Sequence, residues 1–156
     1  MSKISIIINS FYTLIATLSF GILSNIRGKN LFFASIGGAL TWFFYLLTHS
    51  YFHISNMFSF FIASAMGAVY SEIMARVKKT PVTTFVICSI IPLVPGGGMY
   101  NTMFEVVQGN INNALILGLK TLSIAGIIAV GVFFVSSISK TISLFRKKIF
   151  SNITKK

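Results

Sequence analysis

Residues 87–108, ICSIIPLVPGGGMYNTMFEVVQ, decide how this chain folds, because they place a break inside an apolar segment. The segment begins as apolar as a lipid-facing helix and then contains Pro92, Pro95 and the run Gly96–Gly98. Proline removes a backbone donor and clashes with the preceding helical turn, and glycine accepts dihedrals that other residues avoid. We therefore predict a helix that is interrupted at residues 95–98 and resumes after them.

The rest of the chain has the composition of a membrane protein. Of its 156 residues 54% are hydrophobic and 10% are charged, whereas a soluble domain has about 25% charged residues. Four stretches of 23, 42, 25 and 19 residues contain no Lys, Arg, Asp or Glu; they are residues 4–26, 30–71, 80–104 and 121–139. A spanning helix needs about 20 apolar residues, so these stretches match one, two, one and one crossings.

The sequence thus predicts an all-α, polytopic membrane helix bundle with about five transmembrane helices. We expect one integral membrane domain over residues 1–156. The expected helices are residues 4–24, 31–48, 54–75, 82–108 with the break at 95–98, and 112–138, followed by a basic cytoplasmic tail at 139–156.

The distribution of basic residues predicts the orientation of these helices. The chain has 13 Lys and Arg against two acidic residues. The basic residues gather between the first and second helices, between the third and fourth, and after the fifth, while the other two connections have none. Basic loops stay in the cytoplasm, which predicts an outside N-terminus and a cytoplasmic C-terminus, although Lys3 argues mildly against it. We interpret the basic tail as a topology determinant that contacts anionic headgroups, with no role in binding nucleic acid.

The half-helix after the break has two interpretations. Its free amide groups and the positive end of its dipole point at the break, and discontinuous helices in transporters hold a substrate carboxylate in this way. Asn101, Glu105 and Gln108 are spaced i, i+4 and i+7, so they share one face. The alternative is a proline-kinked helix that emerges as an amphipathic turn at the outer surface, with this polar face solvated.

Four charged residues are candidates for coupling or gating. Glu105 and Lys120 are predicted either to pair across a cavity or to reach the outer interface separately. Glu72 precedes Arg76 by four residues, the favourable order for a helical ion pair. We expect this pair at the cytoplasmic end of the third helix, with a gate or coupling site as the alternative.

The sequence argues against an enzyme and against a metal or other cofactor. His49 and His53 lie in one predicted outer loop with no third ligand nearby, so we interpret them as interfacial residues. The chain contains no Asp and no nucleotide-binding loop. If the chain moves a substrate uphill, an ion or proton gradient should therefore drive that movement.

Residues 71–103, SEIMARVKKTPVTTFVICSIIPLVPGGGMYNTM, resemble the small, five-helix subunit of the threonine/serine exporter family. The specific part is IIPLVPGGGMYNTM, which is similar to the family's P-L-x-P-G pattern followed by Tyr and Met. That pattern falls on Pro92, Pro95, Gly96, Tyr100 and Met103. The number of helices and the charged tail agree with the family over essentially the whole chain.

The resemblance implies a bacterial inner- or plasma-membrane efflux carrier for small polar metabolites, typically threonine and serine. It also implies a separately encoded larger membrane subunit, because members this short resemble only the second half of the full-length architecture. The alternatives are export of a succinate-type dicarboxylate with the same partner, or a non-transporting membrane scaffold or assembly subunit. The substrate path predicted at the break consists of Pro92, Pro95, Gly96, Gly97, Gly98, Tyr100, Asn101, Thr102 and Glu105, and the residues predicted for coupling or gating are Glu72, Arg76 and Lys120.

Overall fold

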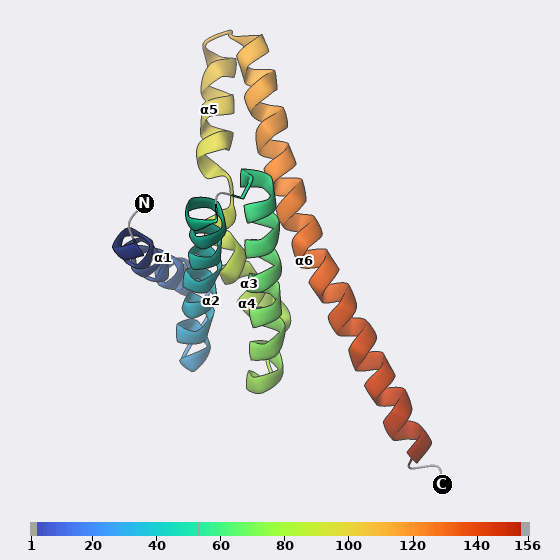
Figure 1. The fold of residues 1–156 in the computed structure, drawn as a ribbon. Helices are drawn as coiled ribbons and strands as arrows, with labels where there is room; N and C mark the ends of the chain where they lie inside the picture. Colours follow the sequence, from blue (N-terminus) through green and yellow to red (C-terminus); the bar gives the residue numbers. More distant parts are fainter. Residues whose placement is uncertain (1–2, 53, 154–156) are drawn as a thin grey trace.

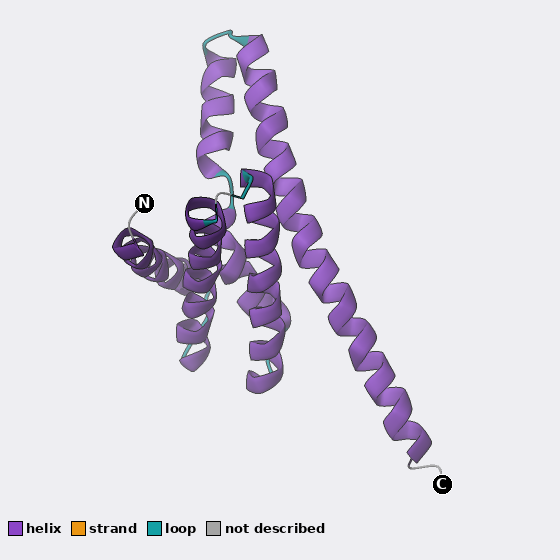
Figure 2. Cartoon of the chain, viewed as in Figure 1, coloured by secondary structure: helices purple, strands orange, loops and turns teal. Residues whose placement is uncertain are grey.

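The protein is all-helical in the computed structural model, which describes the backbone of residues 3–52 and 54–153 and the side chains of residues 5–52, 54–143 and 145. Figure 2 shows helices joined by short loops, and the part of the chain that is described contains no strand. The helices are α1 (Lys3–Leu23), α2 (Lys29–Leu46) with a π-helical turn η1 (Leu47–Tyr51), α3 (Asn56–Lys78), α4 (Val82–Ile90) with a 3₁₀ turn η2 (Ile91–Leu93), α5 (Gly96–Val107) and α6 (Ile111–Ile153).

The predicted polytopic bundle with an interrupted fourth helix is confirmed. Four segments are long and apolar enough to cross a membrane: Ser5–Leu23, Lys29–Tyr51, Asn56–Lys78 and Ile111–Ser143. A fifth, Val82–Leu93 with Gly96–Val107, passes the same criterion only as a pair of helices bent by 56°.

The break itself lies slightly earlier than residues 95–98. The non-helical residues are Val94 and Pro95, and Gly96–Gly98 form the first turn of α5. Pro95 precedes the helix as its N-cap, a place where a missing amide donor is tolerated. None of the three glycines has a positive φ, so their contribution is the absence of a side chain and not an unusual backbone conformation.

Close approach at small residues holds α1 to α4 together. Gly38 faces Thr17 of α1, and Gly67 faces Thr41 of α2. In lipid, where the hydrophobic effect does not bring helices together, such contacts provide the packing. Seven hydroxyl side chains are completely buried here: Thr17, Ser35, Thr41, Ser59, Ser64, Ser71 and Ser89. Most donate to a carbonyl of their own helix, as Thr41 does to Gly37 at 2.9 Å, so these hydroxyls are buried with a hydrogen-bond partner.

Helices α3 and α6 run in the same direction. Ser139 of α6 bonds to Glu72 of α3, and Gly131 of α6 faces Ser64 of α3. Both pairs are 67 positions apart in the sequence. Because moving eight residues along α3 is matched by moving eight residues forward along α6, the two helices are parallel. The chain between them must return across the membrane once. The bent pair of α4 and α5 is therefore one broken span and not a re-entrant loop, which gives five crossings.

Helix α5 and the start of α6 form a hairpin that extends past the ends of α2 and α3 (Figure 1). Helix α6 has 43 residues, or about 64 Å at 1.5 Å per residue, which is about twice the thickness of the hydrocarbon core. Residues 139–153, which were expected as a separate tail, continue this helix.

Candidate functional site

The first turn of α5 presents free backbone amides at the break. Gly96 donates to the carbonyl of Val94 at 2.7 Å, and Met99 donates to that of Pro95 at 3.0 Å. Between them, the amides of Gly97 and Gly98 have no partner in the described part of the chain. A Cβ added to Gly96 or Gly97 would meet nothing within 4 Å. The positive end of the α5 dipole therefore faces open space that a small anionic group can reach.

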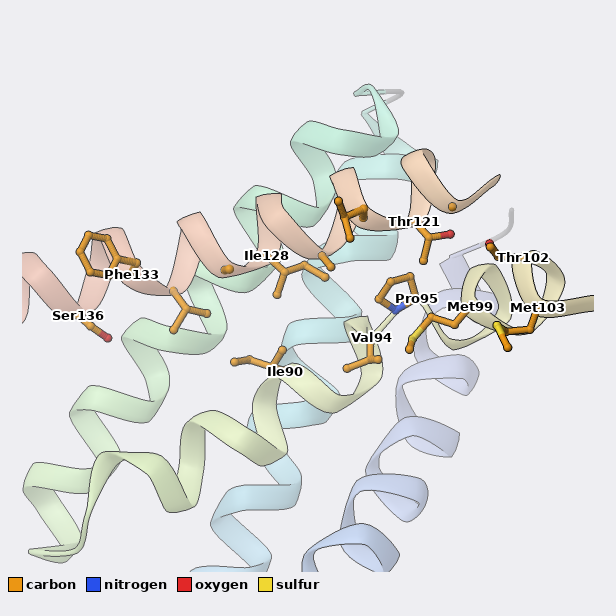
Figure 3. Close-up of a pocket in the computed structure, with 15 residues that line it drawn as sticks. Ile90, Val94, Pro95, Met99, Thr102, Met103, Thr121, Ile128, Phe133 and Ser136 are labelled. Carbon is orange, nitrogen blue, oxygen red and sulfur yellow. The ribbon is translucent and has the colours of Figure 1, made fainter. Parts of the chain in front are cut away.

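A separate apolar groove of about 820 Å³ lies between the break and α6 (Figure 3). Ile90, Val94, Pro95, Met99 and Met103 line one wall, and Leu122, Ala125, Ile128, Ala129, Val132 and Phe133 line the other. Gly96–Gly98 are not among its lining residues. Three hydroxyls line it: Thr102 donates to Gly98 and Thr121 donates to Leu117, each at 2.7 Å, and Ser136 lies on α6. The groove therefore offers mainly apolar surface, whereas the free backbone amides of Gly97 and Gly98 lie outside it.

The hairpin is held by reciprocal close contacts between α5 and α6. A Cβ on Gly98 would lie 2.5 Å from the Thr121 hydroxyl, and one on Gly118 would lie 3.3 Å from a Thr102 methyl. Thr102 and Glu105 follow Gly98 by four and seven positions, so all three occupy the same face of α5, towards α6. The Oε2 atom of Glu105 is buried there and has no hydrogen-bond partner among the described residues.

Glu105 and Lys120 do not form the ion pair that the sequence left open. The described residues contain a single salt bridge, and it lies elsewhere. The antiparallel register of the hairpin explains the separation: Gly118 faces Thr102, so Lys120 lies towards the break and Glu105 lies beyond Thr102, nearer the hairpin turn. Lys120 is exposed on α6.

The remaining residues of the predicted path lie on different surfaces. Tyr100 and Asn101 are exposed, and the Tyr100 ring stacks on Phe104 with centroids 6.3 Å apart. Pro92 lines a smaller cavity of about 270 Å³ beside Trp42. The predicted residues therefore do not converge on one pocket. The predicted path residues that lie together are Gly96–Gly98, at the start of α5.

A polar cluster joins α3 to α6 at the other end of the bundle. The expected pair is present, with Arg76 Nη2 3.8 Å from Glu72 Oε2. Ser139 of α6 donates to the same carboxylate oxygen at 2.6 Å and accepts from Arg76 at 2.7 Å. Sequence reasoning missed Ser139, because nothing in the spacing of one helix indicates which residue of a distant helix it meets.

Comparison with known proteins places these features in a family. A family model described as "Threonine/Serine exporter, ThrE" matches residues 9–138, which run from α1 through the break and into α6. Searches of curated proteins and of solved structures gave no match. The match covers well over half of the chain and confirms the resemblance found in residues 71–103. This multi-pass membrane protein therefore belongs to the threonine/serine exporter family, a family of transporters.

Proposed function

We propose that this chain is the small membrane subunit of a heteromeric exporter that moves small polar metabolites, threonine and serine first among them, out of a bacterial cell. A larger subunit of the same family completes the exporter, and an ion or proton gradient drives efflux across the inner or plasma membrane. The observation that carries this proposal is the pair of free backbone amides at Gly97 and Gly98, beside the open space at Gly96 and Gly97.

The amide end of α5 suits a zwitterionic substrate. Two free N–H donors and the helix dipole favour a carboxylate, and the absence of side chains at Gly96 and Gly97 lets that carboxylate approach the backbone. Asn101 follows Gly97 by one turn, and its side chain is exposed on the same side of α5. In this proposal its amide group binds the substrate's polar atoms.

The arrangement of the basic residues supports the proposed orientation. The Lys78 ammonium lies 3.8 Å from the centre of the Phe33 ring, so the end of α3 lies beside the beginning of α2. Lys140 directly follows Ser139, which is bonded to α3 near the same end. The basic residues after α1, α3 and the spanning part of α6 thus gather at one end of the bundle. By the positive-inside rule this end is cytoplasmic, which leaves the N-terminus outside.

The hairpin supports the proposed partner. Along α5 no residue is buried, and large apolar side chains are exposed on both of its helices, including Met103, Val107, Ile111, Leu115 and Leu119. The hairpin extends past the ends of α2 and α3 (Figure 1). A larger membrane subunit packed against it would cover this surface.

The first test is efflux of threonine and serine from preloaded cells that express this chain, the larger subunit, or both. The proposal requires efflux only with both subunits. Gly97→Leu should then abolish efflux while the two subunits still copurify, because the new side chain fills open space and screens the amides. Gly126→Leu is the matched control, since a Cβ there also meets nothing within 4 Å. Equal efflux in the two variants would contradict the proposed role of the amides in substrate binding.

A second candidate is a non-transporting assembly subunit, which the apolar groove favours. Ala125 and Ala129 are exposed in its wall, and small residues four apart allow another helix to approach closely. Under this alternative Ala129→Trp should abolish copurification and efflux together, and Gly97→Leu should leave both intact. If both subunits reach the membrane and neither amino acid is exported, a succinate-type dicarboxylate is the next substrate to load.

A further inference from the structure

Lys120 is a charged residue inside a candidate membrane span, Ile111–Ser143, and it has no ionic partner in the described part of the chain. The single salt bridge found there joins Arg76 to Glu72. Ionisable groups within transmembrane segments are costly, and they generally pair with an opposite charge or mark the path of a substrate. The ammonium group of Lys120 therefore calls for an anionic partner.

Glu105 is the other charged residue between positions 80 and 139, and it lies too far along the hairpin to be this partner. In the antiparallel hairpin Gly118 faces Thr102. This register places Glu105 about 8 Å from Lys120 along the helix axes. The side chain of Lys120 is exposed on α6, so an anion from outside the chain can reach it.

The apolar groove occupies one side of the α5–α6 hairpin. Gly98 of α5 packs against Thr121 of α6 between the two sides. Met99 is turned by about 100° from Gly98 towards the groove and lines it. Gly97 is turned by the same angle in the opposite direction, and Asn101 shares its side, so neither residue lines the groove. The side of the hairpin that carries Gly97 and Asn101, which we call the open side, thus presents a free backbone amide and a side-chain amide.

Lys120 belongs to the open side as well. On α6 Leu122 follows Thr121 and lines the groove, whereas Lys120 precedes Thr121 and is turned the opposite way. The contacts of the hairpin place Lys120 between the levels of Gly97 and Asn101, about 2 to 4 Å from each along the axis. Packed helices have axes about 8 to 10 Å apart, and the flexible stem of lysine reaches into the space between them.

Helix α3 ends before it can cover the open side at this level. The constant offset of 67 positions between α3 and α6 puts Asn56, the first residue of α3, level with Ser123 of α6. Lys120 thus lies just beyond the end of α3, which explains its exposure. A small anion beside this end of α3 can therefore contact Lys120, the Gly97 amide and Asn101 together.

We propose that Lys120 binds the carboxylate of the exported substrate, together with the free amides of Gly97 and Gly98. The ammonium group compensates the charge of the carboxylate, and the amides donate hydrogen bonds to it. A compound that lacks the carboxylate leaves these donors without a partner, so Lys120 selects acids over the corresponding alcohols. This inference rests on the proposed function, because it assigns a further binding residue to the same site.

Restoring the charge chemically tests the role of the ammonium group, in proteoliposomes that contain both subunits and the Cys88→Ala background. Lys120→Cys should raise the KM for threonine about tenfold or more, because a hydrogen bond between charged groups is lost, while kcat changes less. Aminoethyl methanethiosulfonate adds a positive charge to the cysteine and should restore most of the affinity. Methyl methanethiosulfonate adds a neutral group and should not, and the complex with Lys120 intact, treated with each reagent, is the control. An unchanged KM in Lys120→Cys, or equal rescue by the two reagents, would overturn the proposal.

A binding measurement in the same proteoliposomes separates this proposal from the choice of substrate. The readout is alkylation of Asn101→Cys by N-ethylmaleimide, followed by the mass of this chain. Threonine and succinate should each slow the reaction, and threoninol, in which an alcohol replaces the carboxylate, should not. Lys120→Gln should remove this protection, whereas Lys120→Arg keeps the charge and should retain it. Lys140→Gln, at another exposed lysine of α6, is the matched control and should also retain it.

The outcomes distinguish the two proposals. Protection by succinate without protection by threonine would overturn threonine as the substrate and support Lys120 as a carboxylate-binding residue. Absence of protection by either acid, equal protection by threoninol, or full protection in Lys120→Gln would overturn the role of Lys120.

Discussion

Ser139 of α6 and Glu72 of α3 are joined by a hydrogen bond of 2.6 Å between Ser139 Oγ and Glu72 Oε2. Arg76 contacts both members, at 2.7 Å from the serine hydroxyl and 3.8 Å from the carboxylate. The Glu72 side chain is 15% exposed and that of Arg76 is 50% exposed. The Ser139 hydroxyl thus lies between two charged side chains, donating to one and accepting from the other. These bonds hold α6 against α3 at residue 139.

Ser139→Ala should therefore destabilise the protein by about 1 to 2 kcal/mol, since it removes two hydrogen bonds to charged groups at a partly exposed site. Thermal unfolding of the purified protein checks this, with an expected fall of a few degrees in the midpoint. Ser143→Ala, one turn further along α6 at an exposed position, is the control and should leave the midpoint unchanged. Equal midpoints for the two variants would mean that the cluster does not hold the helices together.

Gly131→Leu should separate α6 from α3. A Cβ at this position would press against the Ser64 hydroxyl and lie 3.1 Å from the Phe61 carbonyl oxygen, which is backbone and cannot move aside easily. Overpacking of this kind costs about 1 to 3 kcal/mol. Chemical denaturation in mixed micelles measures the loss.

Gly126→Leu is the matched control for Gly131→Leu, on the same helix and with nothing within 4 Å of an added Cβ. It should leave stability unchanged or raise it by up to about 0.8 kcal/mol, because leucine has the higher helix propensity. A similar loss in both variants would contradict the contact between Gly131 and Ser64.

The hairpin register predicts a disulfide between Thr102→Cys and Gly118→Cys. A Cβ at Gly118 would lie 3.3 Å from the Thr102 methyl carbon and more than 4 Å from the Thr102 Cβ, which places the two Cβ atoms near the upper end of the range of about 3.5 to 4.5 Å found in disulfides. In a Cys88→Ala background, mild oxidation should remove both thiols from labelling under denaturing conditions. The pair Asn101→Cys with Gly118→Cys should stay reactive, because Asn101 is exposed away from α6.

Cys88 should resist alkylation in the folded protein. It is completely buried, in a cluster with Ala34, Ala75 and Phe85, and it is the one cysteine of the chain. N-ethylmaleimide should modify it only after denaturation, as read from the mass of the intact protein. Rapid modification under native conditions would mean that α4 does not pack in the bundle as described.

The sequence alone predicted the helices well because lipid imposes a simple constraint. Charged residues are excluded from the hydrocarbon core, so the four charge-free stretches delimit the spans. The prolines at 92 and 95 also indicated where the fourth helix is interrupted. The glycine run was less informative, because glycine fits both a break and the first turn of a helix. In the structure Gly96–Gly98 form the first turn of α5.

Contacts between helices were beyond prediction from spacing. Ala63 with Gly67 and Ala125 with Ala129 have the same four-residue spacing, yet the first pair is buried and the second is exposed in the groove wall. Which face of a helix meets a neighbour depends on rotations that are set by the whole bundle. For the same reason, the sequence could not predict the contact of Ser139 with Glu72 or the separation of Glu105 from Lys120.

The position of the contact between Gly131 and Ser64 has a mechanical consequence. Gly131 lies close to the midpoint of the 43 residues of α6. This contact can therefore act as a pivot with about half of the helix on each side. About 20 residues, or about 30 Å, of α6 lie on either side of this pivot. A rotation of α6 by about 10° about it would therefore move the two ends by about 5 Å in opposite directions. Opening the cluster at Ser139 on one side of this contact would thus displace the hairpin that carries Gly98 and Glu105 on the other.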